Sequence, residues 1–318
     1  MKTNIVYQED CIEGMKKLPK ESVDLIIADP PYYKKINEEW DKQWKTETEF
    51  IEWCRSWFKE CVRVLKPTGS FYCYGFFDIL SKLKVLVFDK ELFFRQNITL
   101  SKGIKSIAGR TSDKLRMFPT ASEYLFFYVK QNDNGTSVND YFREELKKIG
   151  IANDINKLFW KNGWVNKGSN IASHFFGRNG QNCLPTLEQY QRLQSTGHFQ
   201  KSYEELQKIY NSQRFFFNLP LGVTDVWEFN IDKNRFHPTQ KPKQITDRII
   251  KASSNKNQIV LIPFGGSGSE VLSCIRNFRQ FICFENNPQY FKIINDRIQS
   301  AKSQTQLSNE SCPTEDLI

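Results

Sequence analysis

Short apolar runs alternate with amphipathic segments along the first 130 residues. The run Val23–Ala28 has the length and β-branching of a buried strand, and residues 70–74 and 123–129 share this character. Between the first two runs, apolar side chains recur on one helical face over residues 47–65. Strands that alternate with helices in this way predict a mostly parallel, doubly wound α/β sheet.

The alternation stops at the polar segment 131–135 and resumes near Asp225. Helical periodicity in between predicts helices at 138–149, 153–160, 187–194 and 203–212. The polar, finally acidic end of the chain has too few apolar residues to pack. The predicted organisation is an α/β half at 1–130, a helical insertion at 131–222, a second α/β half at 223–300 and a disordered tail at 301–318.

Two consecutive prolines end the first buried strand, in the segment Asp29-Pro30-Pro31-Tyr32. Proline has no N–H to donate and a fixed φ, so the strand stops there in a rigid, non-helical shelf. In open α/β sheets the carboxyl ends of the strands bind ligands, and this shelf adds a carboxylate, backbone carbonyls and an aromatic ring. An ordinary Pro-Pro turn is the alternative interpretation. Residues 33–46 show no period and predict a mobile loop over this edge, and residues 66–69 predict a turn.

A glycine-rich turn follows the later strand at 258–262 and precedes a predicted helix at 269–277. Glycines in such a turn let the backbone approach a ligand and aim free N–H groups at it. Glu285 ends the next strand, which is where the ribose hydroxyls of a nucleotide-type ligand are held. The pattern therefore predicts a second ligand-binding element.

Composition describes an ordinary soluble protein of 318 residues, with 39% hydrophobic and 25% charged residues. No apolar run reaches membrane-spanning length and the N-terminal residues show no secretory pattern, so we expect a cytoplasmic protein without a membrane. The eight cysteines form no C-x-x-C pair and the three histidines have no metal-ligand spacing, so we expect no metal site. A net charge of +9 suggests a polyanionic partner.

Two loops carry candidate DNA contacts. The segment 101–118 lies between two predicted strands and offers cations for phosphate: Lys102, Lys105, Arg110, Lys114 and Arg116. The segment 173–182 contains side chains of the types that contact base edges: Arg178, Asn179 and Gln181. A solvated loop and a plain helical insertion are the alternatives for the two segments.

Six segments, in this order, resemble the motifs of the DNA amino-methyltransferases whose catalytic half precedes their cofactor-binding half. They are Asp10-Cys11, Asp29-Pro30-Pro31-Tyr32, Leu65-Lys66-Pro67-x-Gly69-Ser70, His237-Pro238-Thr239-Gln240-Lys241-Pro242, Phe264-x-Gly266-Ser267-Gly268 and Glu285-Asn286-Asn287-Pro288-x-Tyr290. The resemblance covers about 1–130 and 223–300, and implies a Rossmann-like methyltransferase fold with the helical insertion as target-recognition domain. Ile262 stands where the family usually has Asp, and Ser269-Glu270 replace the usual Thr-Thr.

The resemblance implies S-adenosyl-L-methionine as cofactor and double-stranded DNA as partner. Catalytic residues would be Asp29, Pro30, Pro31 and Tyr32, with Lys241 reaching the methionine carboxylate of the cofactor. The implied cofactor-binding residues are Asp10, Cys11, Asp29, Lys241, Pro263, Phe264, Gly265, Gly266, Ser267, Gly268, Glu285 and Asn286. An exocyclic base amine is a poor nucleophile, and Asp29 with the Pro30 carbonyl can accept its two hydrogens while Tyr32 stacks on a flipped base.

Asp29 favours adenine N6 as the methylated atom, because N4-cytosine enzymes resemble Ser-Pro-Pro-Tyr at this shelf. N4-cytosine methylation, RNA or protein amino-methylation, and a catalytically inactive DNA-binding regulator are the alternatives. A cognate restriction endonuclease, a homodimer and the recognised DNA sequence stay open.

Overall fold

The computed structural model describes residues 2–103, 116, 118–130, 138–150, 155–164, 184–212, 222–229, 236 and 240–310. The chain divides into two compact units, one formed by Met1–Gln131 with Phe215–Ile318 and the other by Asn132–Arg214. The helical unit therefore ends before the boundary at residue 222 that the sequence predicts.

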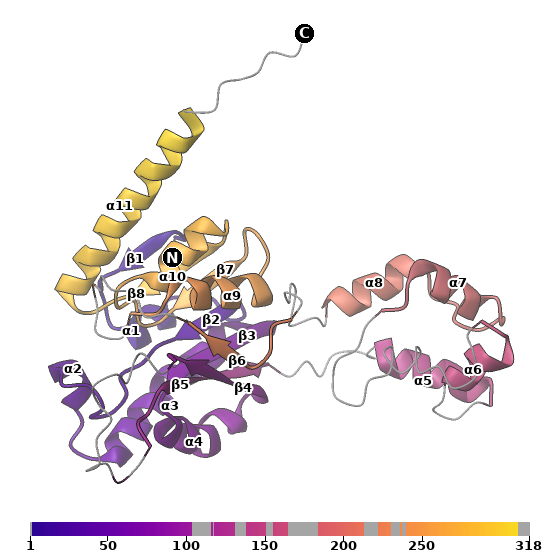
Figure 1. Ribbon diagram of the computed structural model, residues 1–318, viewed down its shortest axis with the longest axis horizontal. Helices are drawn as coiled ribbons and strands as arrows, with labels where there is room; N and C mark the ends of the chain where they lie inside the picture. The colour runs from indigo at the N-terminus through magenta and orange to yellow at the C-terminus, as the bar shows by residue number, and fades with distance from the viewer. Residues whose placement is uncertain are drawn as a thin grey trace. The chain divides into compact units, whose positions relative to one another are not determined.

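The described part of the first unit contains one sheet (Figure 1), whose eight strands lie in the order β1-β8-β7-β2-β3-β5-β4-β6. Their bounds are β1 Ile5–Tyr7, β2 Val23–Ala28, β3 Leu65–Gly75, β4 Phe93–Ser101, β5 Ser122–Val129, β6 Val226–Glu228, β7 Ile259–Ile262 and β8 Gln280–Phe284. Among these strands β5 alone runs antiparallel to its neighbours, β3 and β4. The mostly parallel sheet confirms the predicted fold class.

Helices cover both faces of the sheet, as Figure 1 shows for α3 and α4 on one side and α9 and α10 on the other. The first face packs on α1 (Cys11–Lys16), α3 (Glu47–Val64) and α4 (Phe77–Leu86). The second packs on α9 (Lys243–Ser253), α10 (Ser269–Arg276) and α11 (Pro288–Glu310). Because strand side chains alternate between faces, Ile26 joins the first core and Ile27 the second.

The chain leaves the two central strands, β2 and β7, in opposite directions. After β2 it passes through the short helix α2 (Glu39–Lys42) and α3 to β3 on one side, whereas after β7 it passes through α10 to β8 on the other. The loops that follow two such neighbouring parallel strands diverge, which opens a crevice at their carboxyl ends. The Asp29 shelf and the glycine turn therefore meet at one edge of the sheet.

Three local predictions differ from the structure. The turn expected at 66–69 is an irregularity within β3, because the pairing with β2 passes from Val23–Leu65 to Leu25–Ser70. The predicted loop at 33–46 contains α2 and is held by buried Asp41, whose carboxylate accepts N–H groups of Lys35 (2.6 Å) and Ile36 (2.7 Å). Helix α11 continues to Glu310, so 301–310 are helical where a disordered tail was expected.

The described residues of the second unit form the helices α5 (Val138–Lys148), α6 (Ile155–Lys161), α7 (Leu187–Gln194) and α8 (Tyr203–Ser212), which confirms the four helices predicted there. They bury their own aromatic core, which includes Phe142, Tyr190 and Phe199. The Tyr190 hydroxyl donates to the Lys201 carbonyl at 2.8 Å and so ties α7 to the segment before α8. Across the described residues of both units, no helix has the length and apolarity needed to cross a membrane.

Candidate cofactor and catalytic site

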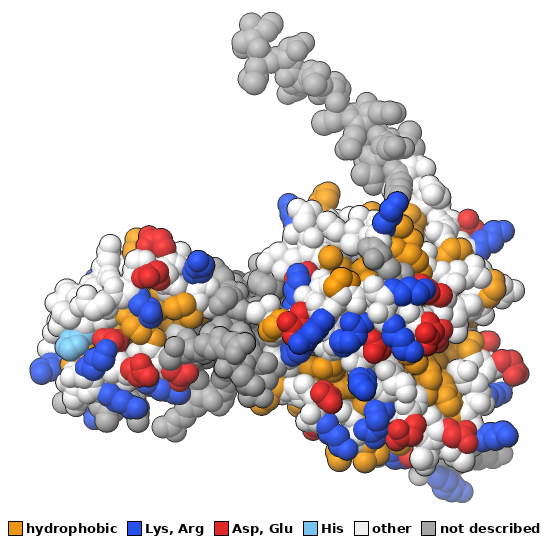
Figure 2. Space-filling view, turned by 180° about the vertical axis from the view of Figure 1, so that it is seen from behind, with side chains coloured by type: hydrophobic (Ala, Val, Ile, Leu, Met, Phe, Trp, Pro, Cys, Tyr) orange, Lys and Arg blue, Asp and Glu red, His pale blue; other side chains and the backbone are white. Residues whose placement is uncertain are grey.

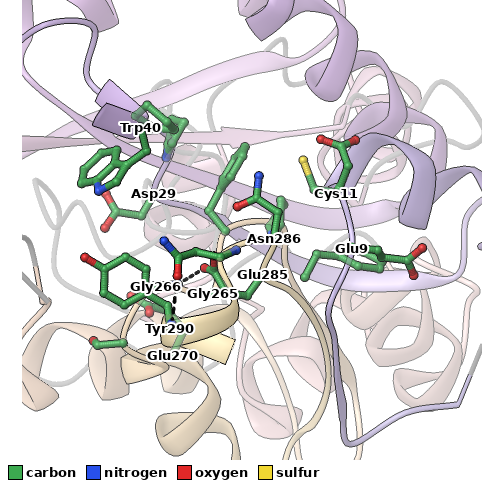
Figure 3. A pocket seen from close by; sticks show the side chains of 18 of the residues that line it. Glu9, Cys11, Asp29, Trp40, Gly265, Gly266, Glu270, Glu285, Asn286 and Tyr290 are labelled. Carbon is green, nitrogen blue, oxygen red and sulfur yellow. Dashed lines mark hydrogen bonds between the residues drawn. The ribbon is translucent and has the colours of Figure 1, made fainter. Parts of the chain in front are cut away.

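A pocket lies where the β2 and β7 strand ends meet, entirely within the first unit (Figure 3). Of the predicted cofactor-binding residues, it is lined by Asp10, Cys11, Asp29, Lys241, Pro263, Phe264, Gly265, Gly266, Ser267, Glu285 and Asn286. Pro30 and Pro31 of the shelf also line it, whereas Gly268 and Tyr32 are not among its lining residues. Segments more than 200 positions apart in the sequence thus converge on one cavity.

The glycine turn is shaped by both packing and backbone conformation. A Cβ on Gly265 would lie 2.8 Å from Cδ1 of Ile294 and 2.9 Å from Sγ of Cys283, so a larger residue would require these side chains to shift. Gly266 and Gly268 have φ values of 51° and 78°, in the left-handed region that favours glycine. Gly268 serves as the N-cap of α10. The turn therefore depends on glycine before any ligand is considered.

Glu285 connects the glycine turn to the end of β8. Its two carboxylate oxygens accept the N–H groups of Gly266 and Asn287, each at 2.7 Å (Figure 3). Burial raises the pKa of Glu285, and the backbone N–H groups partly offset this increase. Each carboxylate oxygen has a second lone pair, so Glu285 retains acceptor capacity toward a ligand in the pocket.

Asp10 and Cys11 mark the start of α1 at another wall of the pocket. The Asp10 carboxylate caps this helix by accepting the N–H of Ile12 at 2.8 Å. The Cys11 thiol is 5% exposed, and burial raises its pKa, so it is a neutral wall of the pocket rather than a nucleophile.

Asp29 belongs to a buried polar cluster, which we call the Lys241 cluster and define as Asp29, Tyr32, Glu123, Lys241 and Lys102. The Lys241 ammonium donates to the Tyr32 hydroxyl at 2.6 Å and pairs with Asp29 at 3.2 Å and with Glu123 at 3.3 Å. The Tyr32 hydroxyl donates to Asp29, and Lys102 pairs with Glu123. The shelf after β2, strand β5 and the segment before α9 are thereby joined through one ammonium group, that of Lys241, which is 4% exposed.

Charges within the Lys241 cluster set its protonation. Desolvation would lower the pKa of Lys241, but Asp29 and Glu123 more than offset this and raise it. Burial alone would raise the pKa of Glu123, yet Lys241 and Lys102 hold it at about 2. Burial raises the pKa of Asp29, and Lys241 counters part of that increase. Lys241 is therefore the group that favours the charged form of Asp29, the form able to accept two hydrogen bonds per oxygen.

Two predicted roles differ from the geometry of the Lys241 cluster. The Tyr32 ring is 3% exposed and packs edge-on against Phe76 at 5.2 Å, so it does not present an open stacking face to the pocket. Lys241 directs its ammonium to Asp29, Tyr32 and Glu123 instead of standing ready for a cofactor carboxylate. The reason is that three acceptors, two from the shelf after β2 and one from β5, converge on one buried cation.

Several lining residues were not predicted as site residues. Trp40 and Gln43 come from the α2 segment, Trp53 from α3 and Tyr290 from α11. Trp53 and Phe264 have ring centroids 5.8 Å apart and form an aromatic wall of the pocket. Trp53 lies beside the predicted aromatic stripe of α3, where its ring packs on those of Phe50 and Trp57. Its helical spacing is that of a core residue, so no local signal marks it as a pocket-lining ring.

The predicted DNA-binding residues lie mostly beyond what the structure describes. Lys105, Arg110, Lys114, Arg178, Asn179 and Gln181 lie outside the described residues, as do His237, Pro238 and Thr239. Arg116 is exposed, while Lys102 is paired with Glu123 and is only 26% exposed, so its charge is matched within the chain. Figure 2 shows Lys and Arg side chains interspersed with Asp and Glu on the visible face of the first unit.

A family model described as DNA methylase, N6_N4_Mtase, matches residues 23–296. The chain belongs to this DNA methylase family. The DNA adenine methyltransferase YhdJ of Escherichia coli strain K12 is 30% identical over 297 residues, which cover 91% of this chain and 80% of that protein. The type II methyltransferase M.HinfI of Haemophilus influenzae is 25% identical over 316 residues, which cover 94% of this chain and 69% of that protein.

Solved structures share the fold of this DNA methylase at low sequence identity. The PvuII DNA methyltransferase, described as cytosine-N4-specific, aligns with a TM-score of 0.55 and 16% identity over 97% of this chain and 92% of that one. The M1.HpyAVI–SAM complex aligns with a TM-score of 0.51 and 18% identity over 92% and 98% of the two chains. S-adenosylmethionine is the methyl donor of the family. Family and fold confirm the resemblance drawn from the motifs.

The charges that line the pocket fit S-adenosylmethionine, which is a cationic nucleoside. Its lining includes five carboxylates, Glu9, Asp10, Asp29, Glu270 and Glu285. Among the described lining residues Lys241 is the one lysine or arginine, and its charge is matched by Asp29 and Glu123. Within the described part of the chain, no group of His, Cys, Asp and Glu side chains is arranged to hold a metal ion.

Proposed function

We propose that this DNA methylase transfers a methyl group from S-adenosylmethionine to the exocyclic N6 of an adenine flipped out of double-stranded DNA. One observation carries the proposal: the Asp29-Pro30-Pro31 shelf lies at the edge of the same pocket that contains the glycine turn and Glu285. A base amine at the shelf and a nucleoside at the glycine turn would occupy neighbouring parts of one cavity.

The cofactor supplies an electrophilic methyl group when it is bound. Glu285 would accept hydrogen bonds from its ribose hydroxyls, and the wall formed by Asp10, Trp53 and Phe264 would border its adenine. Pocket walls of this kind exclude water and fix the position of the donor.

Asp29 and the Pro30 carbonyl would act on the target base. They accept the two hydrogens of the exocyclic amine, which disfavours delocalisation of the nitrogen lone pair into the ring and directs it at the methyl group. Because the amine lies inside the duplex, the base must be extruded before it can reach the shelf. The contribution is positional and electrostatic, and no covalent intermediate with the protein is required.

Adenine N6 is favoured over cytosine N4 by Asp29 and by the similarity to an adenine methyltransferase at 30% identity. The alternative has its own support, since a cytosine-N4-specific enzyme shares the fold. The test is to methylate unmodified double-stranded DNA, digest it to nucleosides and weigh the products by mass spectrometry. We expect N6-methyladenine. N4-methylcytosine would refute the adenine assignment, and absence of both with intact cofactor binding would favour an inactive regulator.

We also propose that the helical unit, Asn132–Arg214, selects the DNA sequence. Its own buried core supports a separate role, because it folds around side chains that the sheet does not share. Arg178→Ala or Gln181→Ala should change which sites are modified, whereas Lys114→Ala should weaken DNA binding for all sequences and reduce its salt dependence. Sequencing the modified positions alongside binding measurements checks this, and equal, sequence-independent losses from all three variants would refute it.

Relatives called type II methyltransferases, M.HinfI and M.HpaI, support a place in a restriction-modification pair. A partner endonuclease and a homodimer remain predictions.

A further inference from the structure

Glu270 is a buried carboxylate in the pocket that the motifs do not assign to any role. It lies in the first turn of α10, directly after the glycine turn, and is 5% exposed (Figure 3). Its Oε1 atom is fully buried and has no hydrogen-bond partner among the described residues. An unpaired buried acceptor has lost its hydrogen bonds to water without replacement, which costs free energy. A ligand that donates a hydrogen bond to it would recover this free energy.

None of the described donors near Glu270 is hydrogen-bonded to Oε1, and several contact other acceptors. The Lys241 ammonium contacts Tyr32, Asp29 and Glu123, within the Lys241 cluster. The hydroxyls of Ser267 and Ser269 pair with each other at 3.3 Å, and the Arg297 guanidinium donates to the Ser267 carbonyl. The Tyr74 hydroxyl also interacts electrostatically with Glu270 and has no hydrogen-bond partner among the described residues, but it is not within hydrogen-bond distance of Oε1. Oε1 therefore keeps an acceptor position for a donor that enters the pocket.

We propose that Glu270 binds the ammonium group of the methionine part of S-adenosylmethionine. This inference rests on the proposed function. An ammonium group has three N–H donors and a positive charge, so it satisfies both the unpaired oxygen and the buried carboxylate. The sulfonium has no hydrogen to donate, the cofactor carboxylate is repelled by Glu270, and the ribose hydroxyls belong with Glu285.

The position of Glu270 in the pocket also suits the methionine end of the cofactor. Glu270 and Asp29 lie close enough to interact electrostatically, so Glu270 is on the side of the pocket where the reacting methyl group must lie. Ile262, at the end of β7, is 1% exposed in the hydrophobic core and brings no polar group to the pocket. Glu270 is thus the carboxylate that the β7–α10 connection supplies.

The protonation of Glu270 gives the binding a pH dependence. Burial first, and then Asp29, raise its pKa to about 7, while its own N–H, Lys241 and Arg297 act in the opposite direction. Tyr74, Cys274 and Cys283 also face it, and burial raises the pKa of each of them, so they stay neutral. An ammonium ligand binds the charged form of Glu270, so cofactor affinity should rise as pH increases toward about 7.

The experiment measures dissociation constants by calorimetry for wild type and Glu270→Gln with three ligands. S-adenosylmethionine carries both cationic groups, S-adenosylhomocysteine keeps only the ammonium, and methylthioadenosine has neither. We expect Glu270→Gln to weaken the first two by a similar factor of about ten to a hundred and to leave methylthioadenosine unchanged. The rise in affinity between pH 5.5 and 7 should also disappear in the variant.

Other results separate the alternatives. Loss for S-adenosylmethionine alone would show that Glu270 acts on the sulfonium, and unchanged affinity for all three ligands would show no role; either overturns this inference. Equal loss for methylthioadenosine would indicate a structural role and also overturns it. Glu52→Gln, which removes an exposed charge on α3, is the matched control, and thermal melts confirm folding. Failure of wild type to bind any of the ligands would overturn the proposed function itself.

Discussion

Replacing Asp29 with alanine should slow methyl transfer by at least about a hundredfold, because a charge-assisted acceptor that acts in the transition state contributes about 2–4 kcal/mol. The cavity should survive, since Pro30 and Pro31 hold the shelf and Lys241 keeps Glu123 as a partner. The affinity for S-adenosylmethionine should therefore change only a few-fold. Single-turnover transfer of a labelled methyl group to DNA, measured beside cofactor calorimetry, checks both statements.

Asp29→Asn is the matched variant for this prediction. It keeps an oxygen acceptor of nearly the same shape and removes the charge, so we expect a rate between those of wild type and Asp29→Ala. A full rate in Asp29→Ala would contradict the proposed chemistry. A lost rate accompanied by lost cofactor binding would show that Asp29 acts on the donor instead of on the base.

The elements that sequence predicts correctly are those with local causes. Val23–Ala28 is a continuous apolar run that ends in two prolines, and the turn at 265–268 has glycines where the backbone needs positive φ or close packing. Each signal lies within a few residues, so no knowledge of the partner strands is required. The fold class and the meeting of the two loops follow from the order of the strands.

The interactions that sequence does not predict are long-range and polar. Lys241 meets Tyr32 across 209 positions and Glu123 across 118, and no local pattern marks a lysine as the centre of such a cluster. The irregularity in β3 arises from pairing with β2, which a turn signal at Pro67 and Gly69 cannot distinguish from a chain reversal. Glu270 stands where the family usually has Thr. Its burial and its place in the pocket lining are known only from the folded structure.

Lys241→Met should destabilise the protein, and it should move the pH dependence of methyl transfer to higher pH. Removing one partner of a buried ion pair costs about 3–5 kcal/mol, because Asp29 and Glu123 are left as buried carboxylates beside each other. Without the ammonium the folded-state pKa of Asp29 rises further, so its charge is lost at higher pH. Urea unfolding and the pH dependence of methyl transfer measure the two effects.

The sign of the pH effect follows from the carboxylates. In wild type the pKa of Glu123 is held at about 2, below its unfolded value, so its contribution to stability is present above the unfolded pKa and is lost as pH falls. In Lys241→Met the carboxyl groups have folded pKa values displaced upward, so the variant loses stability as pH rises. The difference in unfolding free energy between the two proteins should therefore be large at pH 8 and shrink toward pH 4.

Lys102→Met separates the role of Lys241 from that of charge alone. Lys102 also pairs with Glu123 but is 26% exposed and does not contact Asp29, so its loss should cost about 1 kcal/mol of stability. The acid limb of the activity profile, which is the fall in methyl-transfer rate at low pH, should stay at the same pH. Adding Glu123→Gln to Lys241→Met removes one of the two stranded carboxylates and should restore part of the stability. If Lys102→Met moved the acid limb as far as Lys241→Met does, the protonation of Asp29 would not depend on the direct Lys241 contact.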